Sequence, residues 1–156
     1  MIDPIRRSVT VAADPDRTFR TFTREIGSWW PTETHSMAAD REDGSTVTSL
    51  TFEEREGGRV VEIDDRGREG TWATVLTWDP PDRVVLAWKP NTRDEPPTEV
   101  EITFTVVEGG TRVDLEHRGW ERLGDRATQA WQSHMTGWTG LLEQRFAPTV
   151  ALSVES

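Results

Sequence analysis

The sequence lacks cysteine and has a single lysine, Lys89, among its 18 basic residues. Without cysteine the protein has no disulfide, no thiolate metal ligand and no cysteine nucleophile. Any chemistry must therefore come from histidines, carboxylates and hydroxyl groups. No apolar run approaches the roughly 20 residues that a membrane-spanning helix needs, and the first residues lack the apolar segment of a signal peptide. We expect a cytoplasmic protein with no membrane span.

Acidic residues dominate the charge, with a formal net charge of -10 and a pI near 4.8. Nucleic-acid binding proteins need a basic face that replaces counterions on the phosphates. We therefore expect no nucleic acid as a partner. The length of 156 residues fits one domain, residues 1–156, that buries roughly two thirds of the surface of its unfolded chain.

Alternating apolar and polar residues predict seven strands, most clearly in the segment 71–90, where two alternating runs flank a turn at Pro80-Pro81. Successive side chains in a strand point to opposite faces. This period places Phe104 on the apolar face of one strand and turns His117 inward on the next. The predicted strands cover residues 5–13, 46–55, 59–65, 70–78, 83–89, 98–107 and 111–119.

The helical pattern predicts two short helices after the first strand and one long helix at the end of the chain. The first helical segment opens at Asp14-Pro15, which suit a cap and a first helical position, and it ends near Gly27. Residues 32–45 are predicted to be a polar loop. The long helix begins at Asp125 and ends before Pro148, which we expect to stop it. Gly137 and Gly140 fall on its polar flank, where close packing does not explain them.

This order of elements predicts an α+β fold: a curved antiparallel sheet of about seven strands around a long C-terminal helix. Seven strands are too many for a flat sheet, so the sheet curls and the helix lies across its concave side. Such an arrangement leaves space between the sheet and the helix. Whether tryptophan side chains fill that space or leave a cavity is open at this point.

Several short motifs resemble the START-like (SRPBCC) superfamily, which has the helix-grip fold. Within that superfamily they are similar to the bacterial branch homologous to the activator of the ninety-kilodalton heat-shock chaperone ATPase. The resemblance covers residues 5–147 and implies a helix-grip domain, on a scaffold that serves carriers, cyclases and receptors alike. The motifs are Phe22-Thr23 with Trp29-Trp30-Pro31, Trp78-Asp79-Pro80-Pro81 leading to Leu86-Ala87-Trp88, Thr98-Glu99-Val100, Glu116-His117-Arg118-Gly119-Trp120 and Gly137-Trp138.

Histidine and tryptophan side chains are the candidate site residues, because the predicted strands and the helix turn them toward the same interior. His117 and His134 can orient an anionic or polar group, or act as acid and base near neutral pH. Tryptophans suit a flat or apolar ligand, and Trp72, Trp78, Leu76 and Leu86 share one predicted face with Trp88. The same side chains can equally be core residues with satisfied hydrogen bonds. The predicted ligand-binding residues are Trp30, Trp88, Phe104, His117, Trp131, His134, Trp138 and Leu142.

Three functional hypotheses follow. The first is binding of a small hydrophobic or amphipathic molecule between the curved sheet and the helix, without catalysis. The second is an enzyme of cyclase, dehydratase or hydrolase type that uses the histidines as acid and base. The third is a chaperone-interacting protein related to the heat-shock ATPase activator. We expect no metal, since two histidines do not define a zinc site, no cofactor, and either a monomer or a homodimer.

Overall fold

The computed structural model of the protein describes residues 2–155. Its centre is one antiparallel seven-stranded sheet with the strand order β1-β7-β6-β5-β4-β3-β2. Every predicted strand is present, with ends that differ by a few residues. The strands are β1 (Ile5–Val11), β2 (Val47–Phe52), β3 (Arg59–Asp64), β4 (Glu69–Asp79), β5 (Arg83–Trp88), β6 (Thr98–Val107) and β7 (Gly110–Arg118).

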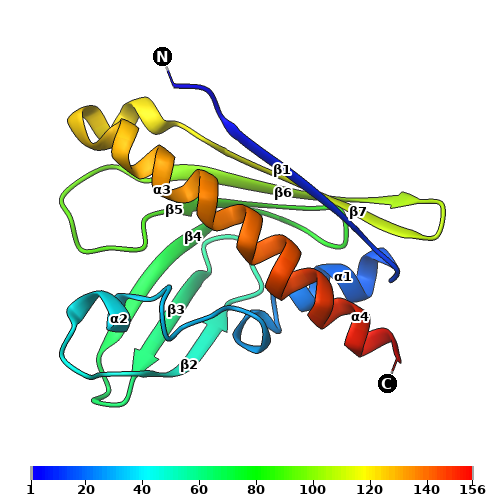
Figure 1. Ribbon diagram of the computed structural model, residues 1–156, viewed down its shortest axis with the longest axis horizontal. Helices are drawn as coiled ribbons and strands as arrows, with labels where there is room; N and C mark the ends of the chain where they lie inside the picture. The colour runs from blue at the N-terminus through cyan, green and yellow to red at the C-terminus, as the bar shows by residue number, and fades with distance from the viewer. Residues whose placement is uncertain (1, 156) are drawn as a thin grey trace.

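The helices lie on one side of this sheet, and the longest one crosses it. Figure 1 shows α3 and α4 running diagonally in front of the curled strands, with the N-terminal strand β1 beside them. This is the predicted helix-grip arrangement. None of the helices in residues 2–155 is long and apolar enough to cross a membrane. The α-helices are α1 (Pro15–Phe22), α2 (Met37–Arg41), α3 (Ala127–Gly140) and α4 (Ala147–Glu155), with 3-10 turns at Ile26–Ser28 and Trp120–Arg126.

The start of α1 follows the predicted capping. The Asp14 carboxylate accepts a hydrogen bond from the backbone N–H of Arg17 at 2.8 Å, and Pro15 occupies the first helical position. These two features satisfy a free N–H group and fix the first turn. The helix turns Phe19 and Phe22 into the core.

The predicted polar loop at residues 32–45 is wrong, because α2 forms within it. Ser36 caps this helix through a 3.0 Å bond from the Ala39 N–H. The carboxylate of Glu62, on β3, accepts the N–H groups of Met37 and Ala38. Met37 and Ala38 are buried. Contacts from a distant strand therefore make a helix of residues whose local pattern indicates a loop.

The long helix also differs from its prediction at both ends. Asp125 lies in the 3-10 turn Trp120–Arg126, and Arg126 occupies the N-cap of α3. At the other end the helix continues past Pro148 because Leu141–Phe146 form a π-helical turn, in which the Ala147 N–H bonds the carbonyl of Leu142. The wider turn relieves the clash between a proline ring and the carbonyl four residues earlier, so α4 follows directly.

Strand β4 departs from the predicted side-chain alternation. Its pairing with β3 shifts at Trp72, which lies between the partners of Val60 and Val61. Trp72 and Ala73 are both buried as a result, and Val75 is 1% exposed while Leu76 is 45% exposed. The prediction that Leu76 shares the inner face with Trp72 is therefore wrong, since the bulge at Trp72 reverses the alternation of the residues that follow it. Beyond the bulge, Trp78 pairs with Val84 across the hairpin.

Aromatic side chains fill the space between the sheet and the helices in two adjoining clusters. The phenylalanine cluster consists of Phe19, Phe22, Trp29, Phe104 and Phe146, with neighbouring ring centroids 5.1–6.0 Å apart. The tryptophan cluster consists of Trp30, Trp72, Trp88 and Trp138, together with His117 and His134. Trp29 and Trp30 join the two clusters at 5.6 Å.

Candidate functional site

A pocket of about 310 Å³ opens beside the tryptophan cluster. It lies between α3, the segment that leads into α2, and the strands β4 and β5. Pockets that bind small molecules have volumes from about 300 Å³ upward, so this one suits a small ligand. Its lining residues are Trp30, Thr34, His35, Ser36, Asp40, Trp72, Trp88, Pro90, Ser133, His134, Gly137, Trp138 and Leu141.

The four indole rings form the inner wall of the pocket and fill most of the interior behind it. The ring centroids of Trp30 and Trp72 are 5.0 Å apart, and those of Trp88 and Trp138 are 5.5 Å apart. All four side chains are almost fully buried. The interior is thus neither one open cavity nor completely filled: tryptophans close the centre and leave a pocket at its edge.

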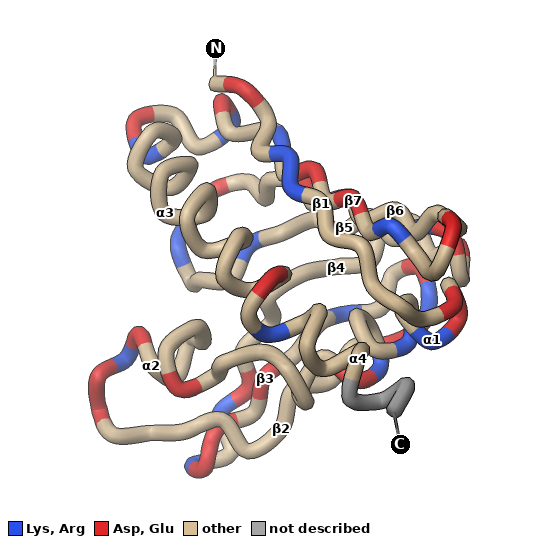
Figure 2. Tube along the Cα trace, turned by 45° about the vertical axis from the view of Figure 1, so that its right-hand side comes forward, with Lys and Arg blue, Asp and Glu red and all other residues tan. Residues whose placement is uncertain are grey.

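One face of α3 forms a second wall. Five lining residues are adjacent or three to four positions apart, so they share one side of the helix. They are Ser133, His134, Gly137, Trp138 and Leu141. Helix α3 contains no Lys, Arg, Asp or Glu, so its trace is tan in Figure 2. This wall therefore offers apolar surface, a hydroxyl group and one imidazole.

The segment from Trp30 to Asp40 forms the outer rim. The indole N–H of Trp30 donates to the carbonyl of His35 at 2.6 Å, and the Thr34 hydroxyl lies 2.8 Å from Nδ1 of His35. Asp40 is exposed at the rim. Partial burial and the nearby charge of Glu62 raise the pKa of the Asp40 carboxyl above its ordinary value.

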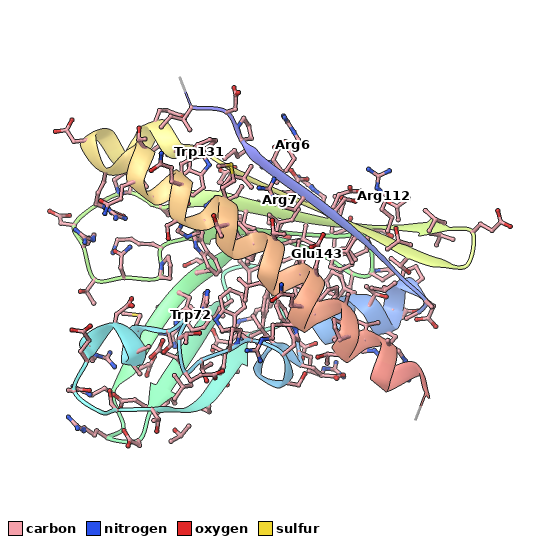
Figure 3. All side chains as sticks on the ribbon, in the orientation of Figure 1. Arg6, Arg7, Trp72, Arg112, Trp131 and Glu143 are labelled. Carbon is pink, nitrogen blue, oxygen red and sulfur yellow. The ribbon has the colours of Figure 1, made fainter. Side chains whose placement is uncertain are left out.

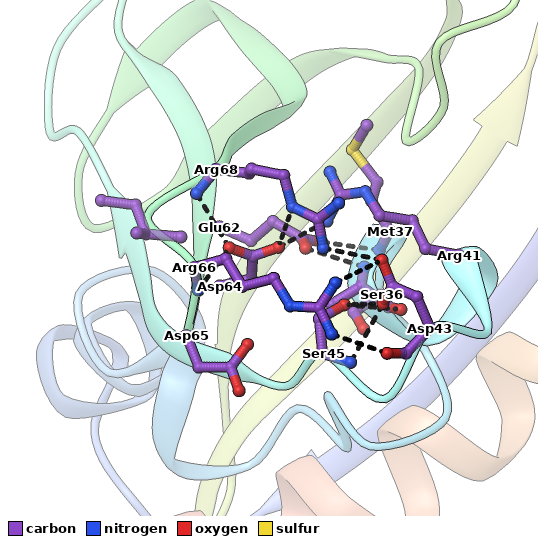
Figure 4. Close-up of polar contacts among 12 residues, drawn as sticks. Ser36, Met37, Arg41, Asp43, Ser45, Glu62, Asp64, Asp65, Arg66 and Arg68 are labelled. Atoms are coloured by element: carbon purple, nitrogen blue, oxygen red, sulfur yellow. Dashed lines mark hydrogen bonds and ion pairs between the residues drawn. The ribbon is translucent and has the colours of Figure 1, made fainter.

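Glu62 connects this rim to the tryptophan wall. Its buried carboxylate accepts the backbone N–H groups of Met37 at 2.6 Å and Ala38 at 2.9 Å, and also the indole N–H of Trp72 at 2.6 Å. Figure 4 shows Glu62 beside a network in which Arg41 and Arg68 pair with Asp64. These bonds hold α2, and hence the rim, in one position against the sheet.

His134 is the imidazole that lines the pocket. Its Nδ1 donates to the carbonyl of Ala130 at 2.9 Å, and its Nε2 accepts the indole N–H of Trp88 at 3.3 Å. A carbonyl only accepts and an indole N–H only donates, so these partners assign the neutral tautomer. Burial lowers the pKa of His134 below its ordinary value. Near pH 7 it is therefore a neutral imidazole with both ring nitrogens bonded to protein groups.

His117 faces the interior as predicted but lies behind the pocket wall. Its Nδ1 accepts the indole N–H of Trp138 at 3.0 Å, and its Nε2 donates to the Thr98 hydroxyl at 2.7 Å. Burial, followed by the proximity of His134, lowers the pKa of His117 well below its ordinary value. Both ring nitrogens are occupied by protein groups, and His117 does not line the pocket.

Of the eight predicted binding residues, the pocket brings together Trp30, Trp88, His134 and Trp138. The other four lie elsewhere. Phe104 belongs to the phenylalanine cluster, and Leu142 is buried without lining the pocket. Trp131 donates its indole N–H to the carbonyl of Asp3, and Figure 3 shows it near the start of α3, away from Trp72.

The predicted set of binding residues did not include Glu62 or the lining residues Asp40, Ser36 and Thr34. Asp40, Ser36 and Thr34 belong to the segment predicted as a polar loop, so no periodic signal marked them. Glu62 carried a signal that could have been used, because it is a carboxylate within the otherwise apolar run Val60-Val61-Glu62-Ile63. A charge in such a run needs buried partners. Among residues 2–151, whose side chains the structure describes, no three histidine or carboxylate side chains are grouped so that they could hold a metal ion.

The solved structures that resemble this chain include two proteins above 25% identity. One is Txn09, an anthrahydroquino-γ-pyrone synthase solved in complex with SUM: 34% identity, 86% of this chain and 86% of that chain covered, TM-score 0.55. The other is CalC, a self-sacrificing resistance protein from Micromonospora echinospora: 29% identity, 94% and 93% covered, TM-score 0.69. None of the curated proteins matches the chain.

A more distant structure supports the same fold. The Aha1 dimer from Colwellia psychrerythraea has 17% identity, covers 96% of this chain and 97% of its own, and superposes with a TM-score of 0.66. The family model described as "Activator of Hsp90 ATPase homolog 1-like protein" matches residues 12–150. This match confirms the resemblance drawn from the short motifs. The chain belongs to the family of Activator of Hsp90 ATPase homolog 1-like proteins.

Proposed function

We propose that this protein binds a small amphipathic molecule with a flat aromatic part in the pocket beside α3. The observation that carries the proposal is that four tryptophans and the neutral imidazole of His134 line one pocket of about 310 Å³. Binding sites for small molecules typically combine apolar and aromatic walls with a few placed polar groups. Indole rings provide large contact surfaces for a flat partner.

The polar lining supports a ligand with hydrogen-bonding groups at one edge. Ser36, Ser133 and Thr34 supply hydroxyl groups, whereas both ring nitrogens of His134 are bonded to protein groups. Asp40 is the single carboxylate in the lining, and its raised pKa reflects surroundings that disfavour its charge. The tryptophan end of the lining holds no Lys, Arg, Asp or Glu, so we expect a ligand that is neutral at its buried end and polar at the rim.

The name of one relative supports a fused-ring ligand, and the name of the other gives no ligand. The protein with 34% identity is named as a synthase of an anthrahydroquino-γ-pyrone, a name that denotes fused rings. The protein with 29% identity is named as a resistance protein. A shared fold alone does not carry function, so the proposal depends on the pocket, and the relatives guide the choice of ligand.

Native mass spectrometry tests this proposal directly. We expect purified protein to retain a mass that is lost on denaturation, or to acquire one when incubated with a fused-ring phenol such as alizarin. The variant Ser133→Trp places a large side chain at the pocket wall and should abolish that complex. Gln132→Trp is the matched control, since Gln132 is exposed on the same helix outside the lining. Equal binding by the two variants would refute the pocket as the binding site.

Catalysis in the same pocket is a second candidate, favoured by opposite pKa shifts at two lining residues. The raised pKa of Asp40 favours its protonated form, which can act as an acid, and the lowered pKa of His134 favours its neutral form, which can act as a base. His134 accepts a proton at Nε2 only when the Trp88 indole N–H leaves that nitrogen, while Nδ1–H remains bonded to Ala130. A mass change of the bound molecule that occurs in wild type and stops in His134→Gln, with unchanged circular dichroism, would support catalysis. His35→Gln is the control at the exposed rim.

A further inference from the structure

Gly137 stands in the middle of α3, where glycine is unfavourable for a helix. Helices lose stability at glycine because the residue gives up more backbone freedom than alanine does on folding. Two structural needs commonly justify such a glycine: a left-handed backbone or close packing. Gly137 meets neither, because its backbone is helical and a Cβ atom added there would meet no atom within 4 Å.

The pocket supplies the missing reason. Gly137 is a lining residue, and it lies between His134, three residues earlier, and Leu141, four residues later, on the same helix wall. The space that its side chain would occupy is therefore pocket space. Without a Cβ atom, the helix backbone at this point is open to close approach by a ligand.

We infer that Gly137 determines ligand size in this pocket, by leaving room for a fused aromatic ring system to lie against the backbone of α3. This inference rests on the proposed binding of a flat aromatic ligand. It restricts the expected ligands to molecules wider than two fused rings. A side chain at position 137 would reduce the width between α3 and the tryptophan wall. The effect should be greater for a wide ligand than for a narrow one.

Gly140 provides a matched control one turn along the same helix. Its added Cβ would lie 3.9 Å from the Gln144 side chain, an ordinary contact, and Gly140 does not line the pocket. Both Gly137→Ala and Gly140→Ala should raise the Tm by roughly 2–4 °C, because alanine favours the helix. The two substitutions therefore have the same expected effect on folding and differ in what they do to the pocket.

Isothermal titration calorimetry with two phenols of different width tests the inference. The probes are naphthol, with two fused rings, and alizarin, with three. We expect Gly137→Ala to weaken alizarin binding by about tenfold, as an overpacked methyl group would, and naphthol binding by much less. Gly137→Leu should abolish alizarin binding without lowering the Tm. Gly140→Ala should bind both probes like wild type.

Each outcome has a distinct meaning. Wild type that binds neither probe would overturn the proposed function, and the role of Gly137 with it. Wild type that binds alizarin while Gly137→Ala and Gly137→Leu bind it equally well would overturn the inference alone. An equal loss of both probes in the Gly137 variants, or an equal loss in Gly140→Ala, would also overturn it, since neither result reflects ligand width at position 137.

Discussion

The two aromatic clusters of the interior differ in how their polar atoms are used. In the phenylalanine cluster, the one indole N–H, that of Trp29, bonds the backbone carbonyl of Thr21, and the other members carry no polar side-chain atom. In the tryptophan cluster every indole and imidazole has a polar partner. One end of the interior is held by packing, and the other by packing and a chain of directed bonds.

This difference explains why the pocket lies where it does. Phenylalanines can be packed from all sides, so the space around them closes completely. Indoles and imidazoles need partners at fixed positions, and those partners, the Glu62 carboxylate and the carbonyl of His35 among them, hold the rim and the wall in place. A pocket bounded by hydrogen-bonded groups can remain open because its walls are fixed independently of a ligand.

Substitution of two adjacent leucines tests the contrast between the closed core and the open pocket, and it has the largest expected effect on stability. Leu142 is buried without lining the pocket, whereas Leu141 lines it. Leu142→Ala should lower the free energy of unfolding by about 3–5 kcal/mol, since it leaves a closed cavity. Leu141→Ala should cost nearer about 2 kcal/mol, because the lost atoms only enlarge space that water already reaches. Urea denaturation of both variants measures the difference, and equal losses would contradict the contrast.

The two buried histidines make the tryptophan cluster sensitive to acid. Their pKa values are lowered in the folded protein, so below about pH 6.5 the unfolded chain binds more protons than the folded one. Stability from these groups is complete above that pH and falls as the pH decreases, by up to about 1.4 kcal/mol per pH unit for each histidine. Urea midpoints measured from about pH 7.5 to about pH 5 should show this slope.

Substitutions assign that slope to particular residues. His134→Gln should reduce the slope by about half, because one of the two titrating groups is gone. His35→Gln is the control, since His35 is exposed at the rim. A midpoint that is flat over this pH range in wild type, or a slope that follows His35, would show that the buried pair does not control the acid sensitivity.

The fold was predictable because its signals are local. Alternation of side chains and the glycine or proline breaks fixed all seven strands, and Asp14 with Pro15 fixed the start of α1. The errors arose where a distant contact decides the structure. Residues 37–41 form α2 because Glu62 accepts their N–H groups, and the helix passes Pro148 because a π-helical turn precedes it.

The site was less predictable, since periodicity assigns a face of an element but not a position along it. His117 and Trp131 both have the orientation that their patterns indicate toward the interior side. One lies behind Trp138 and the other lies beside the N-terminal strand. For Gly137 the prediction failed in the other direction. The helical pattern predicts that it lies on the polar side of the helix, away from the interior, whereas it lines the pocket.

Removing one indole N–H from each aromatic cluster compares the two clusters directly. The expected difference between the two variants is the smallest of those predicted here. Trp138→Phe deletes the donor to Nδ1 of His117 and should cost about 1–3 kcal/mol, because a buried acceptor loses its partner. Trp29→Phe deletes the donor to the Thr21 carbonyl and should have a similar cost. Stability at neutral pH therefore does not distinguish the two variants.

Titration of His117 distinguishes them. The Trp138 indole donates to Nδ1 and so favours the neutral imidazole. Without it the pKa of His117 should rise toward its ordinary value, and the loss of stability in acid should become shallower in Trp138→Phe. Trp29→Phe should leave both unchanged, because its N–H does not contact a titrating group. NMR titration of the His117 ring measures the shift directly. If Trp29→Phe moved this titration as much as Trp138→Phe, the two clusters would be electrostatically one unit, and the distinction between a packed end and a hydrogen-bonded end would fail.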